Sequence, residues 1–160
     1  MARAVSLPIS EDLAERLRAE GEASDQPPPI LAASLLDEGL KIRQFPGIIY
    51  MDGPSGRRAS LADGPDVWQI IRALQEVPAD EHDPVETVCI EADLCVRQVK
   101  LAMHFNEAYP DEIEAKIEDN RAAAALIDEM IAERERDVAQ GNTAKYKWAK
   151  TQRSYSDPSL

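Results

Sequence analysis

The amino-acid sequence predicts a mainly α-helical fold that also contains a short N-terminal strand and a small β-hairpin. Several stretches repeat apolar residues every three or four positions, as one buried helix face does, and the longest stretch covers residues 111–139. Residues 4–9 alternate apolar side chains with smaller or polar ones, which is the pattern of a half-buried strand. Turn-forming residues 52–56 lie between two β-rich runs and predict a hairpin over residues 43–62.

Two helices are expected between the N-terminal strand and the hairpin. Ser10 suits the N-cap of the first helix, and a break at residues 21–29 separates it from a second helix that starts near Pro28. The apolar residues expected on the inner face of the second helix are Leu31, Leu35, Leu36 and Leu40. A lone strand leaves backbone donors and acceptors unpaired. We therefore predict that a second copy of the chain pairs with it and forms a homodimer.

A third amphipathic helix is expected directly after the hairpin. Asp63 is the expected cap, because it opens a Gly-Pro turn before the first apolar residue. The expected inner face consists of Val67, Ile70, Ile71 and Leu74, and Trp68 adds bulk.

Residues 83–110 have the features of a helix-turn-helix, around which the rest of the chain is expected to be organised. Asp83 is a good N-cap, and Pro84 suits the first helical position. Asp93 tolerates the left-handed conformation that a tight turn requires. The second helix is expected over residues 95–108, because the Tyr-Pro pair that follows ends helical geometry.

The second helix of this pair carries a basic stripe. Arg97, Lys100 and His104 fall on one side, and the expected inner face is Val96, Val99, Ala102 and Met103. Two short helices with such a stripe have the form of a DNA reader. On spacing alone, two ordinary packed helices with a solvated charged face remain the alternative.

The charge of the chain is unevenly distributed. The net charge of −12 argues against a general nucleic-acid binder. Residues 81–120 hold eleven acids and three bases, a net of −8, whereas residues 141–160 hold four bases and one acid, a net of +3. The contrast predicts an acidic body with a basic tail.

Composition also favours some compartments and chemistries over others. The chain has no apolar run near the roughly 20 residues of a membrane span and no basic region followed by a long apolar stretch, so we expect a cytoplasmic protein. Cys89 and Cys95 suit either reduced thiols or a disulfide. The sequence contains no Gly-rich phosphate loop, no Cys/His metal spacing and no nucleophile elbow. We therefore predict neither enzyme activity, nor a cofactor or metal, nor a small-molecule substrate.

The N-terminal segment resembles a known family of bacterial regulators. The stretch AVSLPISEDL at residues 4–13, followed by two helices that end in LLDEGL at residues 35–40, is similar to the ribbon-helix-helix repressors and antitoxins. The resemblance implies a two-stranded ribbon in the DNA major groove with Ala4, Ser6 and Pro8 facing the bases. Ala and Pro make no bidentate base contacts. The segment is therefore expected mainly to dimerise, with Arg3 contacting phosphate.

A second resemblance covers about residues 45–120. The motifs FPGII, GRR, DGPDVW, the helix pair and YPDEI occur in the order seen in domain-of-unknown-function family 433. Residues 93–95 are Asp-Leu-Cys where that family often has Gly-Leu-Ser. The resemblance implies an antitoxin, commonly encoded beside a small toxin with a PIN-like nuclease fold.

These observations divide the chain into four predicted segments. They are a ribbon-helix-helix module at 1–44, a hairpin with helix-turn-helix at 45–110, a long helix at 111–140 and a basic-aromatic tail at 141–160. The side chains predicted to contact DNA are Arg3, Ser6, Arg57, Arg58, Arg97, Gln98 and Lys100. For the two hairpin arginines, solvated turn charges are the alternative.

The last 18 residues are predicted to be disordered in the free protein and to bind a partner. Their predicted contact residues are Tyr146, Lys147, Trp148, Lys150 and Arg153. A cation here would replace the metal charge in the carboxylate cluster of a PIN-like nuclease, and the aromatics would anchor it in apolar grooves. A solubilising tail and nonspecific DNA contact are the alternatives.

The predicted function is therefore that of an antitoxin in a type II toxin–antitoxin pair. It would neutralise a PIN-like ribonuclease and bind operator DNA as a dimeric autorepressor. A stand-alone transcriptional regulator without a toxin is the main alternative, and a pure protein adaptor is a third.

Overall fold

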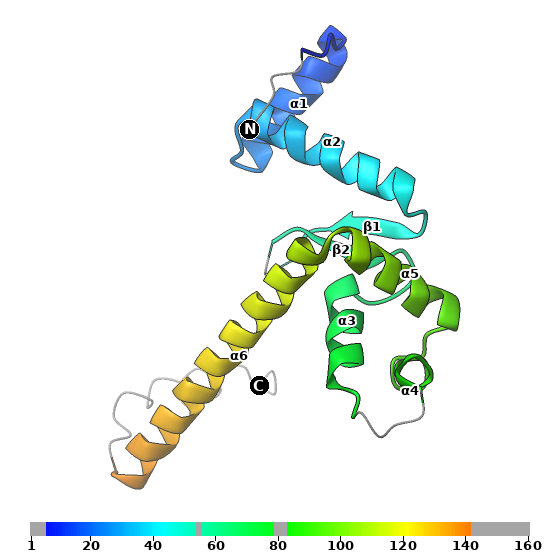
Figure 1. The fold of residues 1–160 in the computed structure, drawn as a ribbon. Coiled ribbons are helices and arrows are strands. Elements are labelled where there is room, and N and C mark those ends of the chain that lie inside the picture. The colour runs from blue at the N-terminus through cyan, green and yellow to red at the C-terminus, as the bar shows by residue number, and fades with distance from the viewer. Residues whose placement is uncertain (1–5, 54–55, 79–82, 142–160) are drawn as a thin grey trace, which may run out of the picture. The chain divides into compact units, whose positions relative to one another are not determined.

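The computed structural model describes residues 6–53, 56–78 and 83–141, and the chain divides into two compact units at residues 1–113 and 114–160. The described residues form six helices and a two-stranded antiparallel sheet (Figure 1). This confirms the prediction of a mainly helical chain with a small hairpin. The elements are α1 (Glu11–Ala23), α2 (Pro28–Gln44), β1 (Ile48–Met51), β2 (Arg58–Leu61), α3 (Val67–Glu76), α4 (Pro84–Glu91), α5 (Val96–Ala108) and α6 (Pro110–Ala139).

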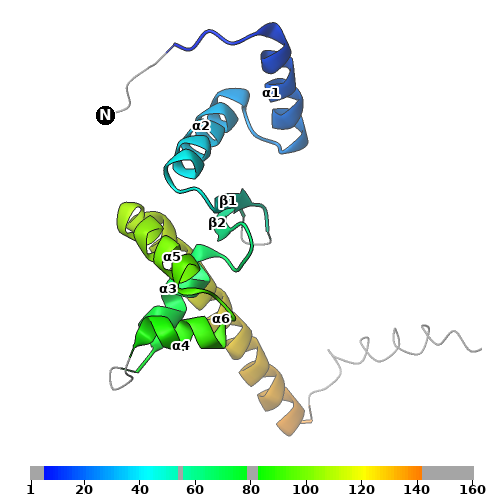
Figure 2. The same cartoon turned by 90° about the vertical axis from the view of Figure 1, so that its right-hand side faces the viewer.

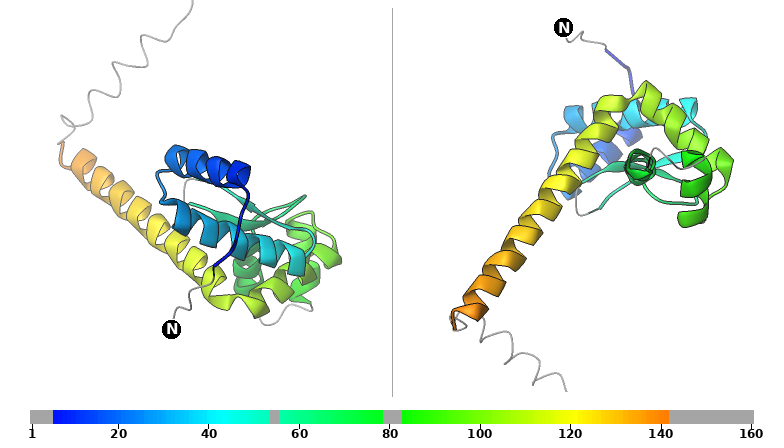
Figure 3. Two further views of the ribbon diagram at one scale, coloured as in Figure 1. Left: turned by 90° about the horizontal axis from the view of Figure 1, so that it is seen from above. Right: turned by 60° about the horizontal axis from the view of Figure 1, so that its bottom comes forward.

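Helices α1 and α2 contact each other and are joined by a tight turn (Figure 3). Ser10 caps α1 as predicted, because its Oγ accepts a hydrogen bond from the Leu13 N–H at 3.3 Å. The Gln26 N–H returns to the Gly21 carbonyl at 2.9 Å, and Asp25 adopts φ 53° between them. Pro28 then begins α2.

The turn explains why residue 21 is glycine. A Cβ there would lie 2.7 Å from the Gln26 carbonyl oxygen. The backbone of the turn therefore occupies the space that any larger side chain would need.

The predicted N-terminal strand has no counterpart among the described residues. Residues 6–10 carry no strand and pair with neither β1 nor β2, and residues 1–5 lie outside the described part of the chain. A strand exists only where another backbone satisfies its donors and acceptors, and the partner expected here is a second copy. The ribbon therefore stays a prediction.

The inner face predicted for α2 is largely uncovered in the single chain. Leu31 is buried at 7% exposure, but Leu35, Leu36 and Leu40 are exposed. The prediction that these three turn inward is wrong for the single chain, because α1, which contacts α2, covers only part of the apolar surface of α2.

The hairpin forms where turn chemistry predicts it. Ile48 lies opposite Leu61, and Met51 lies opposite Arg58. Ile48, Ala59 and Leu61 are buried, and they connect the sheet to α3, which contacts β2.

Asp66, and not Asp63, caps α3. The Asp66 backbone N–H donates to Gln69 Oε1 at 3.0 Å, and helix α3 begins at the next residue, Val67. The three residues before it form a turn in which the Pro65 carbonyl accepts from the Leu61 N–H at 3.0 Å. Because this turn is hydrogen-bonded to β2, the helix begins only after it. The prediction that Asp63 is the cap is therefore wrong.

Helices α3, α4 and α5 contact one another and form a three-helix cluster (Figure 2). Asp83 accepts from the Val85 N–H at 2.9 Å and caps α4 as predicted. Asp93 has φ 52° in the turn to α5, as its position predicts, and Leu94 beside it is buried. The local prediction of two helices joined by a tight turn is confirmed.

The inner face of α5 differs from the predicted one at its first turn. Val99, Ala102 and Phe105 are fully buried, whereas Val96 is 49% exposed. Val96 is the first helical residue, and the buried face is centred on the side where α3 and α4 pack. The prediction that Val96 turns inward is therefore wrong.

Helix α6 has the predicted length and ends near Gly141, which adopts φ 73°. Ile113 and Ile117, near the start of the helix, are buried. Leu126, Met130 and Ile131, farther along the helix, are exposed. None of the described helices is both long enough and apolar enough to cross a membrane.

Candidate nucleic-acid interface

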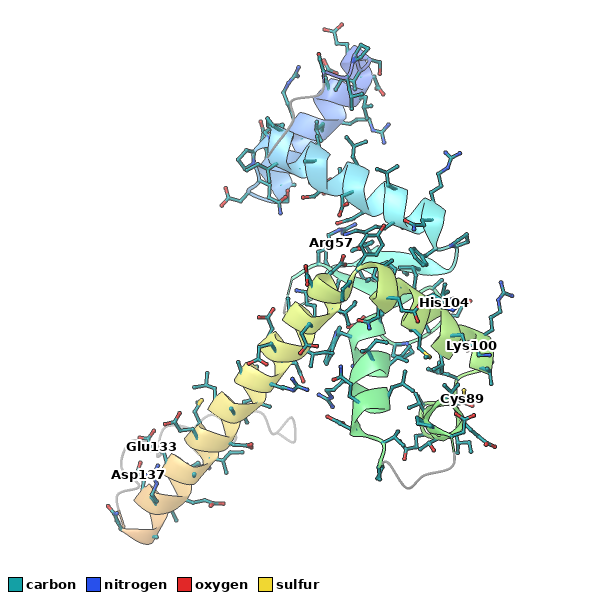
Figure 4. All side chains as sticks on the ribbon, viewed as in Figure 1. Arg57, Cys89, Lys100, His104, Glu133 and Asp137 are labelled. Atoms are coloured by element: carbon teal, nitrogen blue, oxygen red, sulfur yellow. The ribbon has the colours of Figure 1, made fainter. Side chains whose placement is uncertain are left out.

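The outward side of α5 is the candidate interface. Arg97, Lys100 and His104 are all exposed, and their spacing places them on one side of the helix. Figure 4 shows Lys100 and His104 projecting from the outer side of α5. The structure therefore brings together the basic stripe that the sequence predicts.

Packing on the opposite side sets the rotation of α5. The Phe105 ring lies 5.3 Å from the Phe45 ring and 5.1 Å from the Tyr109 ring, measured between centroids. The Tyr109 hydroxyl donates to Gln44 Oε1 at 2.7 Å. These contacts hold the basic side outward.

Sequence reasoning missed Phe105. Its place three residues after Ala102 and six after Val99 was the available signal for a third residue on the buried side.

Gln98 has a structural role at the start of α5. Its Oε1 accepts from the Cys95 N–H at 2.9 Å, and its Nε2 donates to the Asp63 carbonyl at 3.1 Å. Both polar ends of the amide are thus engaged within the protein. The side chain joins the start of α5 to the turn before α3.

Both cysteines at this end of the helix pair are free thiols. Cys89 is half-buried in α4, and Cys95 is exposed. Burial raises the pKa of the Cys89 thiol, and the nearby Cys95, Asp83 and Glu86 raise this pKa further. Cys89 therefore stays protonated at neutral pH and is a weak nucleophile.

The two hairpin arginines are held in ion pairs. Arg57 Nε lies 2.6 Å from Glu38 Oε1, and its Nη1 lies 3.1 Å from Asp52 Oδ2. The hydrogen bond that Arg57 donates to Glu38 raises the pKa of Arg57 despite the opposing effect of burial. Arg58 Nε pairs with Asp66 in a largely buried position. Both charges are compensated by neighbouring carboxylates.

The other predicted contacts lie outside these elements. Ser6 is exposed in the segment before α1. Arg3 and the tail residues Tyr146, Lys147, Trp148, Lys150 and Arg153 lie outside the described residues.

The described residues show no arrangement suited to metal binding. No group of three or more His, Cys, Asp or Glu side chains in ranges 6–53, 56–78 and 83–141 is placed to hold a metal ion.

The exposed side of α5 has a local excess of one positive charge within a strongly acidic chain. It carries two cations, Arg97 and Lys100, and one carboxylate, Glu107.

Comparison with protein family models, curated proteins and solved structures finds no match to this chain.

Proposed function

We propose that this protein is a DNA-binding antitoxin. It acts as a homodimer, binds operator DNA and neutralises a PIN-like ribonuclease. The single observation that carries the DNA-binding part is the outward basic side of α5, held in place by a three-helix cluster.

The α5 side has the chemistry of a DNA reader. Arg97 and Lys100 are long, exposed donors on one helix face, and such side chains contact phosphates or the acceptor edge of guanine in the major groove. Gln98, Arg57 and Arg58 are engaged by protein groups, so α5 contributes chiefly through Arg97 and Lys100. Arg3 and Ser6 supply the second candidate surface.

Dimerisation is supported by the apolar surface of the N-terminal helices. Leu35 and Leu36 on α2 and Leu13 on α1 are exposed in the single chain, together with Leu7 and Ile9. A surface of this kind favours association with a partner. The ribbon-helix-helix resemblance makes a second copy the partner.

The antitoxin part rests on the resemblance to family 433 and on the chain after residue 113. Helix α6 exposes large apolar side chains in its middle, and the sequence beyond residue 141 is basic and aromatic. Neither feature is needed for DNA binding by α5.

The DNA-binding part is tested by fluorescence anisotropy with DNA from upstream of the protein's own coding region. We expect the variant R97A/K100A to bind more weakly at low salt. If both cations contact phosphate, the slope of log affinity against log salt concentration should be smaller in magnitude by about two for each bound subunit. The variant R121A is the matched control, because Arg121 is an exposed cation on α6.

The outcomes separate the alternatives. Equal binding by R97A/K100A and wild type would exclude α5 as the DNA surface and leave the ribbon. Sequence-specific binding without a protein partner would favour a stand-alone regulator. No sequence-specific binding at any salt concentration would contradict the repressor part and favour an adaptor.

A further inference from the structure

Helix α6 presents an exposed apolar surface in its middle. Its members are Leu126, Ile127, Met130 and Ile131, which are 59%, 57%, 62% and 50% exposed. Their positions at i, i+1, i+4 and i+5 place them on one side of the helix. We call these four residues the 126–131 face. Four large apolar side chains clustered within two turns indicate a surface that another group covers.

Carboxylates border this face on both edges. At 100° per residue, Glu129, Glu133 and Asp137 follow one edge, and Asp128 and Glu135 follow the other. Figure 4 shows Glu133 and Asp137 on the same side of α6. Residues 118–139 hold seven acids and three bases, a net charge of −4, and one of these bases, Arg134, lies on the side of the face. A complementary occupant therefore combines apolar groups with an excess of cations.

The segment that follows α6 has this complementary chemistry. Residues 142–160 lie outside the described part of the chain. Their sequence holds four bases and one acid, a net charge of +3, together with three aromatic residues. Two of the aromatics, Tyr146 and Trp148, alternate with Lys145 and Lys147. The segment thus contains both kinds of group that the 126–131 face and its borders call for.

The connection between the two segments is long enough for them to meet. Both belong to the second compact unit, and Gly141 adopts φ 73°, at which the backbone leaves the helix axis. Ile131 precedes Gly141 by ten residues, which is about 15 Å along a helix. Trp148 follows Gly141 by seven residues, and an extended chain of that length spans up to about 23 Å. Trp148 can therefore reach the face on its own helix.

A second α6 is a less favourable occupant of the face. It would bring the same carboxylates against each other, and like charges at close range oppose association. A segment of the same chain has the opposite charge, and its effective concentration at the face is in the millimolar range that short linkers provide.

We propose that the segment after Gly141 folds back along α6, where Tyr146 and Trp148 cover the 126–131 face and the neighbouring lysines pair with the bordering carboxylates. By itself the segment has too little apolar content to fold. Helix α6 supplies the missing apolar surface. This inference does not depend on the proposed function.

Docking on α6 would regulate access to the tail. A molecule that binds the aromatic and basic residues of the tail would have to displace them from α6 first. Its apparent affinity would fall in proportion to the fraction of tails that are undocked. The same contact would shield the apolar face from other molecules.

The test follows the fluorescence of Trp148 in the full-length protein. The chain has two tryptophans, so the spectrum of wild type minus that of W148F isolates the emission of Trp148. We expect this emission at shorter wavelength, and its quenching by acrylamide weaker, than in the protein unfolded in urea, because docking removes the indole from water. Emission and quenching equal to those in urea would overturn the inference.

Removal of the face should release the indole. In the variant I127A/M130A/I131A, measured against its own W148F counterpart, the emission of Trp148 should shift to longer wavelength and its quenching should increase. The control is I90A on α4, because Ile90 is equally an exposed apolar residue. Since all these side chains are exposed, the variants should fold like wild type, which circular dichroism would verify. A Trp148 signal unchanged by loss of the face would contradict the proposal.

A second variant tests the charge pairing and leaves α6 and Trp148 intact. We expect K145Q/K147Q/K150Q to increase the quenching of Trp148. Added salt should expose Trp148 in wild type and have less effect in this variant. The control R16Q/R18Q/R43Q removes three exposed cations from the first unit and should behave like wild type. If the lysine variant also behaved like wild type, the charge pairing that selects this occupant would be refuted.

A mixing experiment tests whether the tail binds its own helix. The variant I127A/M130A/I131A has Trp148 but no face, and W148F has the face but no Trp148. After equilibration of the mixture, Trp148 should stay as exposed as in the first variant alone. Recovery of the wild-type signal would show that the face of a second copy is the binding site, and the proposal would be wrong. Neither DNA nor a protein partner is present, so the outcome is independent of the proposed function.

Discussion

At the scale of single residues, Asp66 joins the hairpin to the three-helix cluster. Its carboxylate accepts hydrogen bonds from Arg58 Nε and Ser60 Oγ on β2, and from Trp68 Nε1 on α3 at 3.1 Å. Ser60 is buried, and so is Arg58 Nη1, for which the described residues provide no hydrogen-bond partner. The charge on Asp66 is therefore the main compensation for a largely buried guanidinium.

Replacing this carboxylate tests its role. We expect Asp66→Ala to lower the free energy of unfolding by about 3–5 kcal/mol, because it leaves Arg58 buried without its counter-charge. Asp63→Ala is the control and should change stability by no more than about 0.5 kcal/mol, because Asp63 is exposed. Urea denaturation followed by circular dichroism would measure both. Similar losses in the two variants would contradict this account.

At the scale of elements, Lys41 ties α2 to β1 and to the start of α6. Its Nζ lies 2.7 Å from Glu112 Oε2 and 2.6 Å from Asp37 Oδ2, and it stands 4.7 Å from the centroid of the Tyr109 ring. The Tyr50 hydroxyl donates to Glu112 Oε1 at 2.7 Å. A carboxylate that accepts from both a lysine and a tyrosine holds three elements of the first unit together.

This network predicts a loss of stability at alkaline pH. Burial lowers the pKa of Lys41, but hydrogen bonds to Asp37 and Glu112 outweigh that effect, so the pKa lies above its ordinary 10.5. Burial is the largest effect that raises the pKa of Tyr50 above its ordinary 10.0, and the hydrogen bond that the hydroxyl donates to Glu112 raises it further. Both groups keep their protons longer in the folded state. Their contribution is therefore full below the unfolded-state values and is lost as pH rises above about 10.

Urea denaturation at several pH values from about 8 to about 11 would measure this loss. The variant Y50F should be less stable than wild type at neutral pH, because Glu112 loses one hydrogen bond, and its stability should decline less steeply above about pH 10. An alkaline decline as steep in Y50F as in wild type would show that Tyr50 does not contribute to it.

At the scale of the whole molecule, the N-terminal helices are the part that the single chain leaves incomplete. Of the large apolar residues in α1 and α2, Leu31 is buried, while Leu35, Leu36 and Leu40 are exposed. Burial of a side chain of this size contributes about 1.5–3 kcal/mol. Association through these helices would therefore gain substantial free energy.

We expect wild type to elute as a dimer, with twice the 17.7 kDa of one chain, in size-exclusion chromatography with light scattering. The variant L35D/L36D should elute as a monomer, because charged groups cannot be buried unpaired at the interface. Ile90→Asp on α4 is the control and should leave the dimer unchanged. A wild-type monomer would contradict the dimer, and with it the ribbon.

The limits of sequence-based prediction are visible in α5. Its length, its turn and its basic side were predicted from spacing, proline and the turn-forming Asp93, all of which act locally. Phe105 was missed, and Val96 was assigned to the wrong side, because both depend on where neighbouring helices pack. The tertiary role of Gln98 depends on the Asp63 carbonyl 35 residues away, and a helical pattern contains no information about such a partner.

The sequence by itself determined where most elements begin and end. Hydrogen bonds and steric effects within a few residues explain the roles of Ser10, Asp83 and Pro110, so these roles can be predicted from the sequence alone. Only the tertiary structure decided which charged side chains are held in ion pairs within the protein and which surfaces face solvent. Among the described residues of the folded chain, Arg57 pairs with Glu38 and Arg58 pairs with Asp66, whereas the outward side of α5 and the middle of α6 stay exposed. The physical reason is that the pairing of a charge and the burial of an apolar side chain depend on groups that only folding brings near.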